Sequence, residues 1–153
     1  MLPLTITALT LAAGVEAEPA DAKPTKIIAR ASWTHSPVDV KSPGKDKVQL
    51  VLRSAAELAV AVPMAEGRAN LAKELKVKDI DWTKQMLVVV SGGTQRKGGF
   101  RVEVTGLELE GETLKVKWKI TPPKGLATQA LTHPAEVVLV PAFAGKVVFD
   151  PAR

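Results

Sequence analysis

The chain has 153 residues, of which 46% are hydrophobic, and it carries a formal net charge of +5 at pH 7. This length has room for one domain, and the apolar content is too high for a chain that is disordered throughout. The sequence contains no cysteine, which excludes disulfides, thiolate nucleophiles and cysteine-ligated metal sites.

The chain begins with an apolar, uncharged stretch. Val15 and Ala17 are small residues at −3 and −1 relative to Glu18, the pattern that precedes signal-peptidase cleavage, so residues 1–17 are interpreted as a signal peptide. The stretch is shorter than the roughly twenty residues that a membrane-spanning helix needs, so no integral membrane span is expected in the mature chain. Residues 18–25 are expected to form a flexible lead-in. The prediction is an exported protein, either periplasmic, cell-surface or secreted.

Two strand-like segments come next. Residues 26–33 and 48–53 are rich in β-branched and other apolar residues that alternate with polar ones, which indicates strands. The intervening residues 35–47 contain prolines and a glycine and are predicted to form a loop.

Two short helices are expected after the second strand. Ser54 is a typical N-cap residue and Glu57 follows three positions later, so a capping box is predicted to start a helix over residues 55–60. Residues 66–75 are rich in helix-forming residues and place two leucines four positions apart on one face. We expect this second helix to cover a sheet.

The rest of the chain has the pattern of antiparallel strands. Residues 86–90 form an unbroken apolar run that is expected at the centre of the core. The later strand-like segments are 100–109, 114–120, 136–140 and 147–149. The first two of these should pair as a hairpin about the Gly111-Glu112 turn. The expected fold class is mostly β (α+β), an antiparallel β-sheet or sandwich-like single domain over residues 26–153 with one or two short helices.

Residue types that carry catalysis or metal binding occur without the spacing that such chemistry needs. His35 and His133 do not form an HxxxH motif, and Ser91 does not stand in a GxSxG motif. The acidic pairs Asp79/Asp81 and Glu108/Glu110 are explained by a solvated strand face. We therefore expect no catalytic residues, no metal site and no cofactor.

The basic charge does not indicate a nucleic-acid site. Lysines occur singly at alternating positions, as in Lys115, Lys117 and Lys119, which is typical of the solvated face of a sheet. The sequence has no tyrosine and only three phenylalanines and three tryptophans, too few for a base-stacking platform. No nucleic-acid partner is expected.

A glycine-rich stretch over residues 91–99 superficially has the composition of a phosphate-binding loop. It lacks the GxxxxGK[ST] order, and a strand pattern follows it where a phosphate loop needs a helix. We interpret it as a flexible, exposed hairpin connection suited to ligand contact. The alternative is that it only connects two strands, with Gly98 and Gly99 required for positive φ angles.

The C-terminal half resembles the PrcB C-terminal domain family over about residues 86–141. The resemblance rests on a central apolar strand, a Lys97-Gly98-Gly99-Phe100 turn where the family has TGGY, and a later proline-rich segment before a valine-rich strand. The segment Ile80-Asp81-Trp82 is similar to the lead-in of such proteins. The residues that carry the resemblance or flank it, and that we take as candidate partner-binding residues, are Gly92, Lys97, Gly98, Gly99, Phe100, Pro123, Gly125, Gln129, Thr132 and Pro134.

The resemblance implies an exported, non-catalytic domain in a family named for an accessory subunit that associates with and stabilises a surface protease. It implies no cofactor and no catalytic residues. Because Lys97 and Phe100 differ from the family turn, the partner recognised here could differ as well. The expected function is an extracytoplasmic protein-interaction domain, an accessory or stabilising subunit of a secreted or surface protease. The alternative is a small β-fold protease inhibitor that acts through its glycine-rich loops.

Overall fold

The computed structural model of the chain describes residues 23–37 and 48–152. The expected signal peptide, most of the expected lead-in and the second part of the loop at 35–47 lie outside the described residues. The elements along the chain are β1 (Lys23–Pro24), β2 (Ala29–Trp33), β3 (Val48–Leu52), α2 (Ala55–Ala61), α3 (Ala65–Glu74), β4 (Gln85–Ser91), β5 (Arg101–Glu110), β6 (Thr113–Thr121), β7 (Ala135–Pro141) and β8 (Lys146–Pro151).

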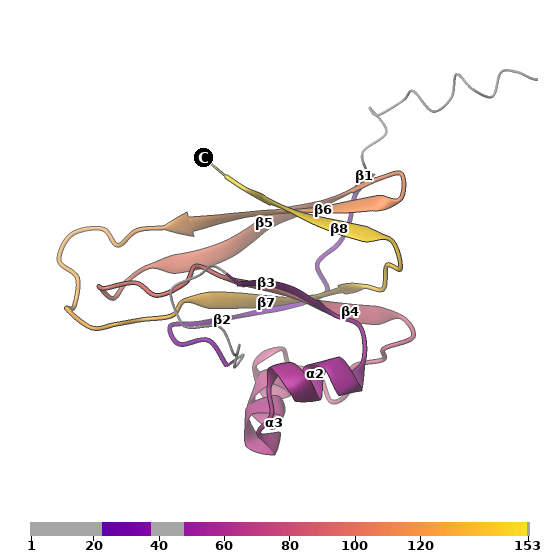
Figure 1. Cartoon of the computed structure of the whole chain (residues 1–153), viewed down its shortest axis with the longest axis horizontal. Coiled ribbons are helices and arrows are strands. Elements are labelled where there is room, and N and C mark those ends of the chain that lie inside the picture. The colour runs from indigo at the N-terminus through magenta and orange to yellow at the C-terminus, as the bar shows by residue number, and fades with distance from the viewer. Residues whose placement is uncertain (1–22, 38–47, 153) are drawn as a thin grey trace, which may run out of the picture.

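The strands form two four-stranded sheets that pack face to face, with both helices on the outer face of one of them (Figure 1). Sheet A has the strand order β1-β5-β6-β8, and sheet B has the order β2-β7-β4-β3. The mostly β, sandwich-like fold class with two short helices is thereby confirmed. The early strands β2 and β3 share sheet B with β4 and β7. Both halves of the described chain therefore contribute strands to sheet B.

Sheet B is apolar on both faces, which explains the unbroken hydrophobic run of β4. Along a strand successive side chains point to opposite faces. Leu87 and Val89 therefore point toward the helices, whereas Met86, Val88 and Val90 point toward sheet A. β7 alternates in the same way, and both strands are buried along almost their whole length. A strand covered on both faces has no reason to alternate apolar with polar residues.

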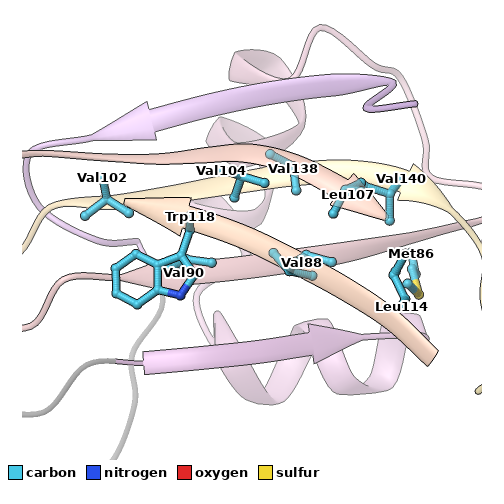
Figure 2. Packing of buried hydrophobic residues seen from close by; sticks show 11 residues of the cluster. Met86, Val88, Val90, Val102, Val104, Leu107, Leu114, Trp118, Val138 and Val140 are labelled. Carbon is cyan, nitrogen blue, oxygen red and sulfur yellow. The ribbon is translucent and has the colours of Figure 1, made fainter. Parts of the chain in front are cut away.

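The layer between the sheets, called here the inter-sheet core, is filled from both sides. β5 and β6 contribute Val102, Val104, Val116 and Trp118, which are at most 1% exposed. Figure 2 shows several of these side chains in the same layer as Val88 from β4. The alternation of β5 and β6 thus directs one apolar face inward and one charged face to solvent, as their sequence pattern predicts.

The second layer, the helix-side core, lies between sheet B and the helices. Leu71 of α3 and Leu75 at its C-terminal cap are each 2% exposed and pack in the same cluster as Leu87 and Leu139 of the sheet. α2 starts at Ser54, whose Oγ accepts a hydrogen bond from the Glu57 N–H. The expected capping box is completed differently, because the Glu57 carboxylate accepts from the N–H of Arg53, one residue before the cap.

The antiparallel expectation fails at the last strand. β8 pairs with β6 in the parallel sense, from Thr113↔Lys146 to Trp118↔Pro151. The reason is that β7, which follows β6 along the chain, belongs to sheet B and pairs there with β2 and β4. The chain therefore crosses to the other sheet and returns to sheet A running in the direction of β6.

A buried carboxylate joins the two sheets at a bulge in β5. The register of β5 against β6 shifts between Val104 and Gly106. Glu136 of β7 is 1% exposed, and its Oε1 accepts from the Val104 N–H at 3.1 Å while its Oε2 accepts from the Ser32 hydroxyl at 3.1 Å. The guanidinium of Arg30 donates to the Val104 carbonyl at 3.2 Å and lies 3.7 Å from Glu136. Together these groups satisfy the edge of β5 and hold sheet A against sheet B.

Candidate functional site

Two long connections meet at one end of the sandwich. The β4–β5 connection, residues 92–100, is called the glycine loop, and the β6–β7 connection, residues 122–134, is called the proline loop. Both lie at the left end in Figure 1. They are hydrogen-bonded to each other: Gln95 and Thr132 exchange backbone hydrogen bonds of 2.8 and 2.9 Å, and the Gly98 N–H donates to the Thr128 carbonyl at 2.9 Å. The two loops therefore form one joined surface, called the loop surface.

Side chains add to this junction. The Thr132 hydroxyl donates to the Lys97 carbonyl at 3.0 Å, and the Gln95 side-chain amide donates to the Gly92 carbonyl at 3.0 Å. The Gly92 N–H donates to the Pro134 carbonyl at 3.0 Å. These bonds satisfy backbone groups that two free loops would leave to water. The expectation that the glycine loop is exposed is therefore wrong for Gly92, Gly93 and Gly98, which are buried.

The glycines of the glycine loop allow close approach. A Cβ at Gly98 would lie 2.2 Å from the Thr128 hydroxyl oxygen, and a Cβ at Gly92 would lie 2.6 Å from Ile120 Cδ1. Gly99 has a φ of +89° and faces Pro123. The explanation of these glycines by positive φ thus holds for Gly99, whereas Gly98 is required by the close approach of the proline loop.

A pocket of about 400 Å³ opens where the loops meet. Its lining comes from both of them: Lys97 and Phe100 belong to the glycine loop, and Pro122, Pro123 and Leu126 belong to the proline loop. Gly125, Ala127 and Gln129 complete the wall. A concave site with apolar walls and a few polar groups is the common form of a binding site.

The structure divides the candidate residues of the sequence into two groups. Those that line the pocket are Lys97, Phe100, Pro123, Gly125 and Gln129. Those that are buried and support the loops from within are Gly92, Gly98, Thr132 and Pro134. Gly99 is exposed and stands against Pro123. The first group can contact a partner directly, whereas the second can act only by shaping the loops. A binding role for either group stays a prediction.

Sequence reasoning missed the most exposed apolar residue of the surface. Leu126, beside the pocket, is fully exposed, and Leu131 on the same loop is 62% exposed. The available indication was a leucine directly after the turn glycine Gly125, in a segment that has no strand or helix pattern to bury it. Exposed leucines on a loop held by hydrogen bonds are suited to contact with another protein.

The two histidines lie next to each other at this end of the molecule. His35 and His133 form an isolated parallel bridge, and their ring centroids are 6.3 Å apart. The bridge joins the segment after β2 to the end of the proline loop. Within the part of the chain that the structure describes, no group of three or more His, Cys, Asp or Glu residues is placed to hold a metal ion. The observed contact between His35 and His133 therefore links two backbone segments.

Three of the four acidic residues in the two pairs, Asp81, Glu108 and Glu110, have structural partners. The Lys117 ammonium donates to Glu108 at 2.7 Å, and this hydrogen bond lowers the pKa of Glu108 and raises that of Lys117. Lys115 lies 3.5 Å from Glu110. Asp81 accepts from the hydroxyl and the N–H of Thr83, which lowers its pKa, and it lies in a turn rather than on a strand. The solvated strand face that was expected is present for the Glu108/Glu110 pair.

A second hollow, of about 610 Å³, lies at the opposite end of the sandwich. The turn at Gly111 lines one side and residues 143–146 line the other. It carries charges of both signs, Glu112 and Lys146, and no fully exposed leucine stands beside it. The loop surface is therefore the better candidate for partner binding.

The fold and the site together define a small β-sandwich domain that presents two joined loops at one end. Residues 86–141 match the family model described as PrcB C-terminal, which confirms the resemblance noted in this region. The match runs from β4 to the end of β7 and contains both loops of the loop surface. The chain matches no curated protein and no solved structure. No helix within the described ranges is long and apolar enough to cross a membrane.

Proposed function

We propose that the protein is a non-catalytic, exported protein-interaction domain that serves as an accessory subunit of a secreted or surface protease. The observation that carries this proposal is that the matched region contains the whole loop surface. The region that matches the PrcB C-terminal family, a family named for a protease complex, is the region that contains both loops of the loop surface.

The loop surface is suited to hold a protein partner. Its backbone is fixed by hydrogen bonds between the loops, so little loop entropy is lost when a partner binds. Leu126 stands in solvent before binding, and its burial by a partner would remove apolar area from water. A rigid frame with an exposed apolar residue beside a pocket is a common arrangement for an interface centre.

The test is affinity capture from the native cell envelope with three forms of the chain: the wild type, Leu126→Ser and Val60→Ser. Val60 is 77% exposed on α2, which packs on the outer face of sheet B, so it is a matched apolar control away from the loops. We expect the wild type and Val60→Ser to capture the same protease and Leu126→Ser to lose it. Absence of any protease in the wild-type capture would overturn the proposal.

The activity of the captured protease then separates two roles. An accessory subunit leaves peptidase activity intact and lengthens its half-life at elevated temperature. An inhibitor abolishes the activity while it is bound. The inhibitor function stays open because both roles use a rigid loop surface, and this assay distinguishes them.

A further inference from the structure

The loop surface carries charge of one sign. Residues 92–101 and 121–135 contain four cationic side chains and no Asp or Glu. These cations are Arg96, Lys97 and Lys124 in the two loops and Arg101 at the start of β5, and all four are exposed. Among the described residues none of the four forms an ion pair. Two joined loops with unbalanced charge give this end of the molecule a positive potential.

Two lysines of sheet A differ from these four cations. On the outer face of sheet A, Lys115 and Lys117 are paired with Glu110 and Glu108. These two cations are therefore neutralised locally and contribute little to a field at a distance. Arg96, Lys97 and Lys124 of the loop surface, with Arg101 next to it, remain as a source of positive potential at this end of the molecule.

Two of the cations, Lys97 and Lys124, stand at or next to an apolar centre. Lys97 lines the pocket together with Phe100, and Lys124 lies between the lining residues Pro123 and Gly125. Leu126, fully exposed, stands in the same wall. A polyanion such as a nucleic acid or a sulfated glycan would use the cations but would leave Leu126 and the proline wall in water. A protein segment with both carboxylates and an apolar side chain would satisfy both features.

We propose, resting on the function proposed above, that the loop surface recognises an acidic protein segment that carries a large apolar side chain. The apolar side chain enters the pocket between Phe100 and Pro123 and contacts Leu126. Carboxylates on either side of it face Lys97 and Lys124. Charge complementarity of this kind accelerates association and excludes basic competitors, while the apolar contact slows dissociation.

The experiment is selection from a random peptide display library on the immobilised chain, followed by fluorescence anisotropy with an enriched peptide. We expect enriched peptides to place Asp or Glu beside Phe, Leu or Trp. Lys97→Glu should weaken binding of such a peptide by about three-fold or more, since even exposed ion pairs contribute up to about 1 kcal/mol and the reversal also adds repulsion. Leu126→Ser should weaken it to a similar or greater extent, and the affinity should fall as salt is raised.

Two control variants make the same kinds of substitution at sites away from the loop surface. Lys78→Glu reverses an exposed charge between α3 and β4, and Val60→Ser removes an exposed apolar side chain on α2. Both should bind the enriched peptide as the wild type does. A version of the peptide with Asn and Gln in place of its acids should bind weakly to every form of the chain.

Other outcomes overturn the proposal. Enrichment of neutral or basic peptides, or equal binding of the amide peptide, would remove the acidic requirement. Binding of heparin or an oligonucleotide that exceeds peptide binding and is unchanged by Leu126→Ser would assign the surface to polyanions. The envelope protease could be captured by Lys97→Glu as well as by the wild type and lost only with Leu126→Ser. That result would agree with the accessory function and would contradict the recognition of an acidic segment.

Discussion

Glu136 shows how one residue can link two layers of the fold. Burial raises the pKa of its carboxyl group, while the Val104 N–H, the Arg30 guanidinium and the Ser32 hydroxyl lower it and Glu103 raises it. The net shift is upward from the ordinary value of 4.5. Desolvation therefore outweighs the polar partners, as is common for a carboxylate with almost no solvent contact.

The raised pKa of Glu136 predicts a pH dependence of stability. The folded state holds this proton more tightly than the unfolded chain, so the contribution of Glu136 is greatest below the unfolded pKa and is lost as pH rises to the folded pKa. The Glu136→Gln variant has no titrating carboxyl group at this position, so it does not lose this stability as pH rises. Its side-chain amide oxygen can still accept a hydrogen bond from the Val104 N–H. We expect the free energy of unfolding of the variant, relative to that of the wild type, to increase with pH over this window and then to level off.

Urea unfolding from about pH 4 to about pH 8 measures this difference, because titrations common to both proteins cancel. The Ser32→Ala variant is the control, since it removes one hydrogen bond and keeps the titrating carboxyl. A difference between Glu136→Gln and wild type that is flat or falls with pH would show that the folded pKa is not raised.

At the scale of elements, local pattern predicted most of the fold. The strands and helices from 48 to 149 were all expected within a few residues of their observed bounds, because each has a clear period, an apolar run of strand length, or a cap such as Ser54. The assignment of strands to two sheets and the parallel direction of β8 were not predicted. The sheet to which a strand belongs and the direction of β8 depend on contacts between apolar faces that are far apart in the sequence. A local sequence pattern contains no information on such contacts.

The candidate site was predicted in part for the same reason. The glycine and proline segments were identified from composition, and the structure brings both to one end. The shared positive charge was not recognised, because Lys124 is distant in sequence from Arg96 and Lys97 and each looks like an isolated surface cation. The distinction between Lys97 at the surface and Gly98 in the interior also needed the contact with Thr128.

Two of the three positive-φ glycines of the loop surface, Gly99 and Gly125, predict unequal costs of substitution. In Gly99→Ala the new Cβ would meet Pro123 Cβ at 2.6 Å, so the variant has both backbone strain and a clash. In Gly125→Ala the φ of +83° remains, but nothing lies within 4 Å. We expect Gly125→Ala to lose about 1–2 kcal/mol of stability, the usual cost of a left-handed residue, and Gly99→Ala to lose more.

Urea unfolding curves of the two variants and the wild type provide the comparison. Equal losses would mean that the two loops separate readily at Pro123. In that case the loop surface would be less rigid than its hydrogen bonds indicate.

At the scale of the whole molecule, sheet B couples the two hydrophobic layers. Residues of β4 and β7 alternate between the helix-side core and the inter-sheet core, so neither layer can lose its packing without disturbing the same strands. Cores that share a sheet are expected to unfold together. The alternative is a helical layer that opens first.

The three tryptophans allow this to be tested. Trp33 and Trp82 pack against the helix-side core, whereas Trp118 lies in the inter-sheet core. A Trp118→Phe variant therefore reports on the helix-side core, and a Trp33→Phe/Trp82→Phe variant reports on the inter-sheet core. Within each variant we expect the fluorescence transition and the far-UV circular dichroism transition to have the same urea midpoint. Fluorescence loss in Trp118→Phe at lower urea than the dichroism change would indicate separate unfolding of the helical layer.

The pairing of β2 with β7 has a consequence for the order in which the protein can be made. Ser32 of β2 and its partner Glu136 of β7 are 104 positions apart. β4 pairs with β3 on one edge, and its other edge is unpaired until β7 is present. A ribosome delivers the chain from its N-terminus, so the apolar run of β4 emerges well before the strand that completes its sheet. During that interval the nascent chain exposes an unpaired, hydrophobic strand edge, the kind of surface that chaperones bind and that aggregates when left uncovered.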